Sequence, residues 1–339
     1  MCPPHNTLNP ARESHLSETH VTYLSRSDVE ATALPMADII DAVEMSLKEK
    51  AHGRVQMPAK HWLEPHPERW FGGMSSLVPA IGYAAMKWQS GSSQNAAKGR
   101  PYLTGMLFLN SIEEGLIDVV MDSTWLTQQR TAAESAVAIK YLAKPGARAY
   151  TQLGCGVQGR SHFEAFRHVL PGLEEVVVFD INEHAAMAFA EHIRLSGYRA
   201  KVASSAREAV DATDIVVTAG VIAPNVKKTI DATWLHPGLL GVAIDYDCYW
   251  KTSALVSADR LVTDDRGQID HIKPYGYFQD CPPISDELGE IVAAMKPGRQ
   301  SDEDVIIACN MGVAVEDVAT AKAIFESARR KNIGSELLR

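Results

Sequence analysis

Three glycines between residues 154 and 159 have the spacing of a dinucleotide-binding turn. They lie in Gly154-x-Gly156-x-x-Gly159, between an apolar run typical of a strand and a segment that can form a helix. Asp180 ends the next apolar run, 21 residues after Gly159, as in the dinucleotide fingerprint. Gly154 permits a tight turn, Gly156 lets a pyrophosphate approach the helix N-terminus, and Gly159 lets the helix pack against the sheet. The alternative is a tight strand–helix turn in an α/β domain without a nucleotide.

Asp180 is expected to accept hydrogen bonds from the adenosine ribose. The next residues, Ile181 and Asn182, include no arginine for a 2′-phosphate, and the carboxylate itself would repel that phosphate. We therefore predict NAD(H) rather than NADP(H) as the cofactor.

Two further strand ends carry residues that could serve a ligand, because parallel sheets bind ligands at the carboxyl ends of their strands. Small residues in Thr218-Ala219-Gly220 would let the cofactor approach. Asp245 and Asp247 end another apolar strand, where an acid could act as a general acid or base. The alternative is that these are exposed loop acids.

Three cations in the first half of the chain could bind an anionic small molecule. Arg54 and Arg130 offer planar guanidinium groups suited to a carboxylate. Lys87 lies within an apolar strand, where a charge is costly unless it is paired or functional. Each of them alone could equally be a surface or structural charge.

The composition argues against several other classes of function. The net charge is −9 and no basic stripe is present, which argues against nucleic-acid binding. His61 and His66 have no companions at metal-ligand spacing, so no metal site is predicted. The five cysteines are scattered and are expected to be reduced thiols in a cytoplasmic protein. No apolar run is long enough to span a membrane.

The order of predicted elements divides the chain into two domains. Residues 1–20 are polar and predict a loose tail. Residues 21–144 predict helices and a mixed or antiparallel sheet, which the helix in 313–339 is long enough to complete. Residues 145–312 alternate strands and helices, the pattern of a doubly wound parallel sheet. The predicted fold class is therefore α/β, with a second α+β domain.

At this level of detail the chain resembles the ornithine cyclodeaminase/mu-crystallin family over nearly its whole length. The resemblance rests on several motifs, which are more specific together than the glycine turn alone: Arg130-Thr131-Ala132-Ala133-x-Ser135, Gly154-x-Gly156-x-Gln158, Asp247-Cys248-x-x-Lys251, Glu287-Leu288-Gly289-Glu290-Ile291, Lys296-Pro297-Gly298-Arg299 and Gly312-x-Ala314-x-Glu316-Asp317. It implies a Rossmann domain with NAD, a substrate-binding and dimerisation domain, and a homodimer.

The resemblance also implies roles for individual residues. Arg54, Lys87 and Arg130 are expected to hold a substrate carboxylate, with Met74 beside them, and Lys87 and Asp247 are the expected catalytic residues. Asp245 is the rival of Asp247. The residues expected to contact the cofactor are Thr131, Gly154, Gly156, Val157, Gln158, Gly159, Asp180, Ile181, Thr218, Ala219, Gly220, Met311 and Gly312.

Two departures from the family pattern argue against ornithine as the substrate. The segment from Gly73 to Pro79 contains no acid where the family's cyclodeaminases have a glutamate. Tyr249 and Trp250 replace a common Pro-Gly and are expected to reshape the substrate pocket. We therefore expect an NAD-dependent dehydrogenase or imine reductase of a small amino or imino acid. A cyclodeaminase and a non-catalytic ligand-binding protein are the alternatives.

Overall fold

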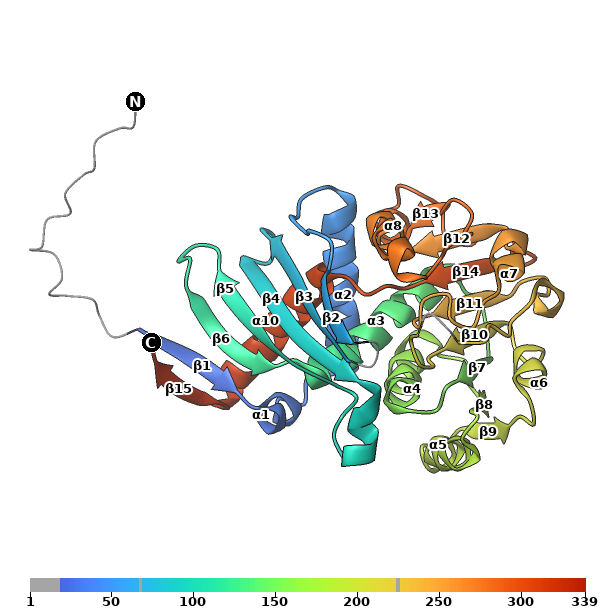
Figure 1. Ribbon diagram of the computed structural model, residues 1–339, viewed down its shortest axis with the longest axis horizontal. Coiled ribbons are helices and arrows are strands. Elements are labelled where there is room, and N and C mark those ends of the chain that lie inside the picture. The colour runs from blue at the N-terminus through green and yellow to red at the C-terminus, as the bar shows by residue number, and fades with distance from the viewer. Residues whose placement is uncertain (1–18, 67–68, 224–225) are drawn as a thin grey trace, which may run out of the picture.

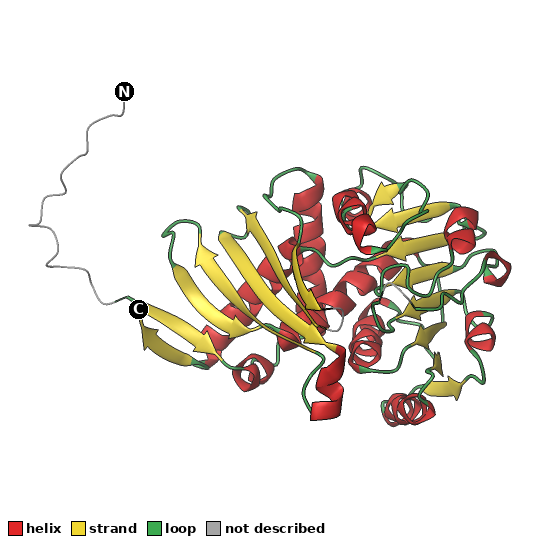
Figure 2. Cartoon of the chain, in the orientation of Figure 1, coloured by secondary structure: helices red, strands yellow, loops and turns green. Residues whose placement is uncertain are grey.

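A computed structural model describes residues 19–66, 69–223 and 226–339, which form two β-sheets with flanking helices (Figure 1, Figure 2). The predicted tail lies almost wholly outside the described residues, although His20 already opens the first strand. The α/β class with a parallel Rossmann-like sheet and a second mixed sheet is confirmed.

The first sheet has the strand order β15-β1-β6-β5-β4-β3-β2. Its neighbours pair antiparallel except β1 and β6, which are parallel. Its strands are β1 (His20–Leu24), β2 (His61–His66), β3 (Arg69–Val78), β4 (Tyr83–Ser92), β5 (Leu103–Ser111), β6 (Ile117–Asp122) and β15 (Ser335–Leu338).

Helices cover one face of this sheet (Figure 1). They are α3 (Thr124–Leu142) and α10 (Ala314–Lys331), on which α2 (Met36–Ala51) packs in turn. The short α1 (Arg26–Ala31) lies beside β1 and β6, and the 3-10 helix η2 (Ser93–Lys98) follows β4. The last helix packs on β3, β4 and β5, and β15 adds an edge strand, which supports our proposal that residues 313–339 complete the first domain.

The second sheet is wholly parallel, in the order β13-β12-β14-β11-β10-β7-β8-β9. Its strands are β7 (Ala149–Leu153), β8 (Glu175–Phe179), β9 (Arg199–Val202), β10 (Ile215–Thr218), β11 (Leu240–Ala243), β12 (Arg260–Thr263), β13 (Asp286–Glu287) and β14 (Ile306–Cys309). The accompanying helices are α4 (Val157–Val169), α5 (Glu183–Leu195), α6 (Ala206–Val210), α7 (Thr252–Ser257), α8 (Arg266–Ile272) and α9 (Leu288–Val292), with the 3-10 helices η3 (Ala232–Trp234) and η4 (Lys273–Tyr275).

The strand order of the parallel sheet reverses between β7 and β10. From β7 the chain moves outward through β8 and β9, then crosses back to β10 and continues the other way through β11. Open α/β sheets bind ligands at such a switch point, at the carboxyl ends of the strands. The glycine turn and Thr218 stand at this point.

The structure corrects three details of the predicted elements. Residues 55–58 do not form a strand, because only Gln56 makes an isolated bridge, to Leu77. The strand β2 was not predicted, since its sequence has no clear alternation. The predicted loop from Gln89 to Arg100 begins as strand, because β4 runs on to Ser92. Within the described part of the chain, no helix combines the length and apolarity needed to cross a bilayer.

The other face of the first sheet is apolar and carries no helix among the described residues (Figure 1). Strand alternation places Lys87 and Leu107 toward the helices, so their neighbours point away. The side chains on this outer face include Phe71, Leu77, Met86, Trp88, Met106, Phe108 and Val120, of which Trp88 is 39% exposed. A contiguous apolar sheet face of this kind is typical of a protein–protein interface.

We predict that this outer face joins two copies of the chain. Phe108→Glu should turn a dimer into a folded monomer, since a charge at the centre of an apolar interface must be desolvated without a partner. Light scattering measures the mass, and circular dichroism checks the fold. Ile112→Glu, at the exposed turn of the same hairpin, is the control and should remain dimeric. A monomeric wild type, or a dimeric Phe108→Glu variant, would refute the prediction.

Candidate functional site

The glycine turn after β7 is shaped by close contact with the end of β10. Gly154 has φ of +94°, and a Cβ atom there would lie 2.4 Å from the Ala219 carbonyl oxygen. A Cβ at Gly159 would lie 2.8 Å from the Gly154 carbonyl oxygen. A Cβ at Gly156 would meet nothing within 4 Å. Two glycines are thus required by packing, whereas Gly156 leaves open space in front of α4.

That open space lies at the N-terminus of α4, where Gly156 is the N-cap and supplies no side-chain hydrogen bond. The first amides of a helix need acceptors from elsewhere and favour an anion. The turn therefore fits the pyrophosphate of a dinucleotide, which would contact Val157 and Gln158 in the first turn of α4. Val157 is 55% exposed.

Asp180 follows β8 and holds the glycine turn in place. Its Oδ2 accepts a hydrogen bond from the Cys155 amide at 2.8 Å, and its Oδ1 accepts one from the Asn182 amide at 2.8 Å. The side chain of Ile181 is 98% exposed beside it. A carboxylate oxygen can accept more than one hydrogen bond, so Asp180 retains capacity for a ribose. Burial raises the pKa of Cys155 to about 12, which makes it a poor nucleophile.

Asp245, the rival acid, is fully engaged inside the protein. Its Oδ1 accepts from the Thr218 hydroxyl at 2.7 Å, and its Oδ2 accepts from the Gly220 amide at 2.8 Å. Burial raises its pKa to about 6, against these hydrogen bonds. Asp245 therefore ties the ends of β10 and β11 together, and the Thr218 hydroxyl, which also accepts from Trp250 at 3.0 Å, is a structural contact.

Asp247 has an unused oxygen. Its Oδ2 accepts from the Phe278 amide at 3.0 Å and pairs with the ammonium of Lys228, whereas its buried Oδ1 has no hydrogen-bond partner among the described residues. Two non-glycine residues in the left-handed region adjoin it, Tyr246 with φ of +60° and Phe278 with φ of +47°. Such strained backbone is found preferentially at functional sites. The geometry favours Asp247 over Asp245 as an acid that exchanges a proton with a ligand.

Lys87 and Arg130 meet at one carboxylate. The Lys87 ammonium donates to Asp317 Oδ1 at 2.7 Å, and Arg130 Nε lies 3.2 Å from the same oxygen. Arg130 Nη1 donates to Glu316 at 3.1 Å. Lys87 is fully buried, and burial lowers its pKa to about 8, although Asp317 opposes this shift. Arg130 Nε forms an ion pair with Asp317 but makes no hydrogen bond among the described residues.

Lys60 joins these two cations and was not among the predicted residues. Its ammonium donates to the Met311 carbonyl oxygen across the two domains. Burial lowers the pKa of Lys60, and Arg130 lowers it further, whereas Asp264 raises it. A single lysine after an irregular segment gives no periodic signal, so its sequence position did not reveal this place.

Three buried acids lie behind the cations. Oxygens of Glu134, Asp264 and Glu316 lie within 4.8 Å of one another. Burial, followed by the adjacent Glu316 and Asp264, raises the pKa of Glu134 well above its usual range, and burial raises that of Glu316 to about 8. Arg130 supplies a positive charge beside these acids, through its hydrogen bond to Glu316. Asp264 directly follows β12, and Asp245 lies two residues after β11, so the same strand-end rule could have found Asp264.

Topology explains why these groups share one edge. The strands β12, β14, β11, β10 and β7 are successive neighbours in the sheet, and their carboxyl ends carry in turn Asp264, Met311, Asp247, Gly220 and Gly154. Burial raises the pKa of Tyr246 to about 12, with smaller contributions from Asp264, which raises it, and Arg130, which lowers it, so both groups lie near the Asp247 loop. The edge thus presents the glycine turn, a carboxylate oxygen without a hydrogen-bond partner and the cation cluster.

The structure does not bring Arg54 into this cluster. Its guanidinium forms two hydrogen bonds with Glu49, at 2.7 and 2.6 Å, and its side chain is 52% exposed. The turn at Gly53 that ends α2 directs Arg54 back along the helix. Lys60, not Arg54, is therefore the third cation near Lys87 and Arg130.

Trp250 does not shape a substrate pocket, contrary to the prediction. It is fully buried in the core of the parallel sheet, where Gly241 makes room for its ring. Tyr249 lies against Gly220 and accepts a hydrogen bond from the Val221 amide at 3.1 Å. Tyr249 therefore supports the loop after β10, and only this residue remains near the predicted ligand edge.

The remaining predicted residues lie in or near the cluster. Met74 is buried and stands opposite Lys87 in the β3–β4 register. Gly312 has φ of +71°, and a Cβ there would lie 2.1 Å from Arg130 Nη1, so this glycine makes room for the guanidinium. Thr131 donates to the Thr127 carbonyl oxygen at 2.7 Å within α3. The four described cysteines, Cys155, Cys248, Cys281 and Cys309, are unpaired thiols, as predicted.

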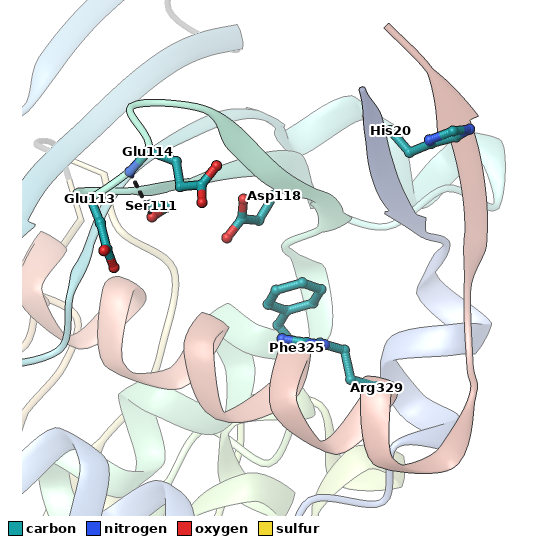
Figure 3. A pocket seen from close by; sticks show the side chains of 7 residues that line it. All are labelled: His20, Ser111, Glu113, Glu114, Asp118, Phe325 and Arg329. Carbon is teal, nitrogen blue, oxygen red and sulfur yellow. Dashed lines mark hydrogen bonds between the residues drawn. The ribbon is translucent and has the colours of Figure 1, made fainter. Parts of the chain in front are cut away.

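A surface hollow elsewhere carries no comparable chemistry. Figure 3 shows it between the turn joining β5 to β6 and the later turns of α10, with the first strand at its side. The residues that line it are His20, Ser111, Glu113, Glu114, Asp118, Phe325 and Arg329. Glu113 and Glu114 are exposed, and Asp118 is half-buried and accepts a hydrogen bond from the Tyr83 hydroxyl at 2.9 Å.

Comparison with known proteins accounts for the arrangement. A family model described as the ornithine cyclodeaminase/mu-crystallin family matches residues 20–332. The chain belongs to this family. Within it, the chain is 33% identical over 324 residues to alanine dehydrogenase of Archaeoglobus fulgidus, covering 93% of this chain and 97% of that protein.

Two solved structures in the comparison share the whole fold. One, an archaeal alanine dehydrogenase dimer with bound NAD, has a TM-score of 0.85 and 32% identity, covering 94% of this chain and 99% of that one. The other, the Δ1-pyrroline-2-carboxylate reductase of Thermococcus litoralis with NADH and L-proline, has a TM-score of 0.84 and 28% identity, covering 94% and 100%. The family resemblance seen in the sequence is confirmed.

The glycine turn yields a prediction that separates packing from ligand binding. Gly156→Ala should leave the melting temperature nearly unchanged but strongly weaken NAD(H) binding, because its methyl group occupies the open space in front of α4. Gly154→Ala should lower the melting temperature, because it places a Cβ against the Ala219 carbonyl and forces a left-handed conformation on alanine, which costs about 1 kcal/mol or more.

Thermal unfolding and NADH fluorescence titration measure the two effects. Unimpaired NADH binding by folded Gly156→Ala would show that the pyrophosphate does not approach this turn.

Proposed function

We propose that this protein is an NAD(H)-dependent oxidoreductase that acts on the C–N bond of a small amino or imino acid. The observation that carries the proposal is the meeting of Lys87 and Arg130 at Asp317, at the edge that also holds the glycine turn. A pair of buried cations with an unused donor suits a substrate carboxylate. The relatives of stated activity at similar identity, an alanine dehydrogenase and a Δ1-pyrroline-2-carboxylate reductase, support the same class.

The cofactor in this proposal is NAD(H), which other members of the family bind. Val157, Gln158 and the glycines would hold the pyrophosphate, and Asp180 the adenosine ribose, with Ile181 and the Ala219–Gly220 segment beside them. Thr131, Met311 and Gly312 remain proposed cofactor contacts. The acid at position 180 and the absence of an adjacent arginine favour NAD(H) over NADP(H). When bound, the cofactor supplies or accepts the hydride at the α-carbon of the substrate.

The residues of the chain then have separate tasks. Lys60, Lys87 and Arg130 bind the carboxylate and so fix the α-carbon relative to the cofactor. Asp247 holds or removes the proton at the substrate nitrogen through its free Oδ1, directly or through water. Lys228 and the Phe278 amide orient this carboxylate by binding its other oxygen. A homodimer is part of the proposal, since the archaeal alanine dehydrogenase is a dimer and the apolar outer sheet face is available.

A cyclodeaminase is the second candidate, since it would use the same cation cluster and return the hydride to the product. Met74 disfavours it, because the residue opposite Lys87 is then a buried thioether rather than an acid that could bind a second amino group. A non-catalytic protein that binds a small ligand is the third candidate, and it would show no turnover at all.

We predict net redox chemistry. In the reductive direction the protein is given NADH with either ammonia and pyruvate or a cyclic imino acid. One NADH should then be consumed for each amino acid formed. NADH absorbance and ammonia are followed together, and L-alanine, L-ornithine and L-lysine are tested with NAD in the other direction. Ammonia released from ornithine or lysine without any net change in NADH would establish the cyclodeaminase instead. Absence of turnover across the whole panel would favour the ligand-binding protein.

The two acids after β11 should respond differently to amidation. Asp247→Asn should lower kcat by roughly a hundredfold or more, the usual contribution of a positioned acid or base, and leave NADH binding nearly intact. Asp245→Asn should instead lower the melting temperature, since an amide nitrogen would face the donors Thr218 and Gly220. Steady-state kinetics and thermal unfolding of both variants measure this. Near-normal turnover in Asp247→Asn would mean that another group transfers the proton.

A further inference from the structure

The last long helix brings two acids into the cation cluster. The helix α10 starts at Ala314, after the segment that leaves β14, and carries Glu316 and Asp317 in its first turn. Both are buried, with Asp317 only 1% exposed. An acid at this position can simply complement the helix dipole, which is worth a few tenths of a kcal/mol to about 1 kcal/mol at an exposed site. Burial against two cations gives Asp317 a different environment.

One oxygen of Asp317 fixes the distance between the two cations. Its Oδ1 lies 2.7 Å from the Lys87 ammonium, on β4, and 3.2 Å from Arg130 Nε, on α3. Without this carboxylate, two like charges would repel each other in a site of low dielectric constant. Its Oδ2 is buried and has no hydrogen-bond partner among the described residues, so the contacts with the cations are what orient the side chain.

We propose that Asp317 is a positioning residue that aligns Lys87 and Arg130 to receive the substrate carboxylate. This inference rests on the proposed function, and it assigns to the helix α10 a part in substrate binding. Glu316 also orients Arg130, because it accepts a hydrogen bond from Nη1 at 3.1 Å. Gly312, which precedes α10, leaves room for the guanidinium because it has no side chain.

The electrostatics of Lys87 give this role a pH signature. The groups that affect its ammonium are Asp317 on α10, Arg130 on α3 and Lys60 after α2. Burial, Arg130 and Lys60 lower the pKa of Lys87 and Asp317 raises it, with a net value of about 8. Lys87 is charged below this pKa and neutral above it, so carboxylate binding should be lost as the pH rises through about 8. Removal of the Asp317 charge should move that loss to lower pH.

The test is calorimetric titration of the full-length protein, loaded with NAD, with pyruvate from pH 6 to 10. Pyruvate offers one carboxylate and has no amine that titrates in this range. Asp317→Asn should weaken pyruvate binding roughly tenfold to a hundredfold, the effect of losing a charge-assisted hydrogen bond, while NAD binding stays unchanged. The alkaline loss of binding should move below pH 8. Glu326→Gln, which removes a charge from the exposed side of the same helix, should change neither quantity.

A merely structural role predicts a different outcome. An Asp317→Asn variant with unchanged pyruvate affinity, or with weakened affinity and an alkaline loss still near pH 8, would overturn the inference. If that variant does not fold, Asp317→Glu decides, because it keeps the charge but displaces the cations. If Asp317→Glu binds pyruvate more weakly but still loses it near pH 8, the positioning role is supported. If this variant binds pyruvate as tightly as the wild type, the positioning role is contradicted.

Pyruvate titration and the turnover assays together distinguish failure of the positioning role from failure of the proposed enzyme activity. Pyruvate binding with the expected pH dependence, in a protein that turns over none of the amino or imino acids, would leave the positioning role standing and refute the enzyme. Absence of pyruvate binding to the wild type would overturn the inference whatever the protein turns over.

Discussion

The buried ammonium of Lys87 is the constraint on which the rest of the structure depends. A charge in an apolar strand is costly to bury, and several kcal/mol are lost if it has no partner. The partner, Asp317, is 230 residues away in sequence and reaches Lys87 only because α10 returns from the parallel sheet to the first sheet. The same carboxylate adjoins Arg130 on α3. One ion cluster therefore joins β4, α3 and α10, so the C-terminal helix is tied to the first sheet.

The other part of the candidate site, around the glycine turn, is held by backbone geometry rather than charge pairing. Gly154 turns at positive φ against Ala219, and Asp180 fixes the following amide. Asp245 joins the ends of β10 and β11, while the left-handed residues Tyr246 and Phe278 leave Asp247 with one oxygen free. A glycine turn set by close packing and a carboxylate with one free oxygen suit the proposed hydride transfer, since misplacement by about 1 Å can cost a hundredfold in rate.

The sequence predicted the features that depend on local chemistry. The glycine turn was recognisable because each glycine has a separate steric reason, and the parallel sheet because strands and helices alternate. Lys87 was recognisable as a charge where the pattern demands an apolar residue. In each case the signal lies within a few residues of the feature it predicts.

Features that depend on direction in space were not predictable in this way. Arg54 and Lys60 are six residues apart and of equal charge, and only the path of the chain after α2 decides which one faces Arg130. Trp250 was placed in the pocket because it follows Asp247, yet its ring turns into the core over Gly241. Lys228 lies in a loop without any pattern, so its pairing with Asp247 is visible only in three dimensions.

The central claim is that the cation cluster at Asp317 binds the carboxylate of a substrate beside NAD. A crystal structure of the protein with NAD and pyruvate tests it most directly. The account predicts a pyruvate carboxylate within hydrogen-bonding distance of Lys87 and Arg130, and its keto oxygen on the side of Asp247. A carboxylate bound elsewhere, with Lys87 and Arg130 still paired only to Asp317 and Glu316, would contradict the account.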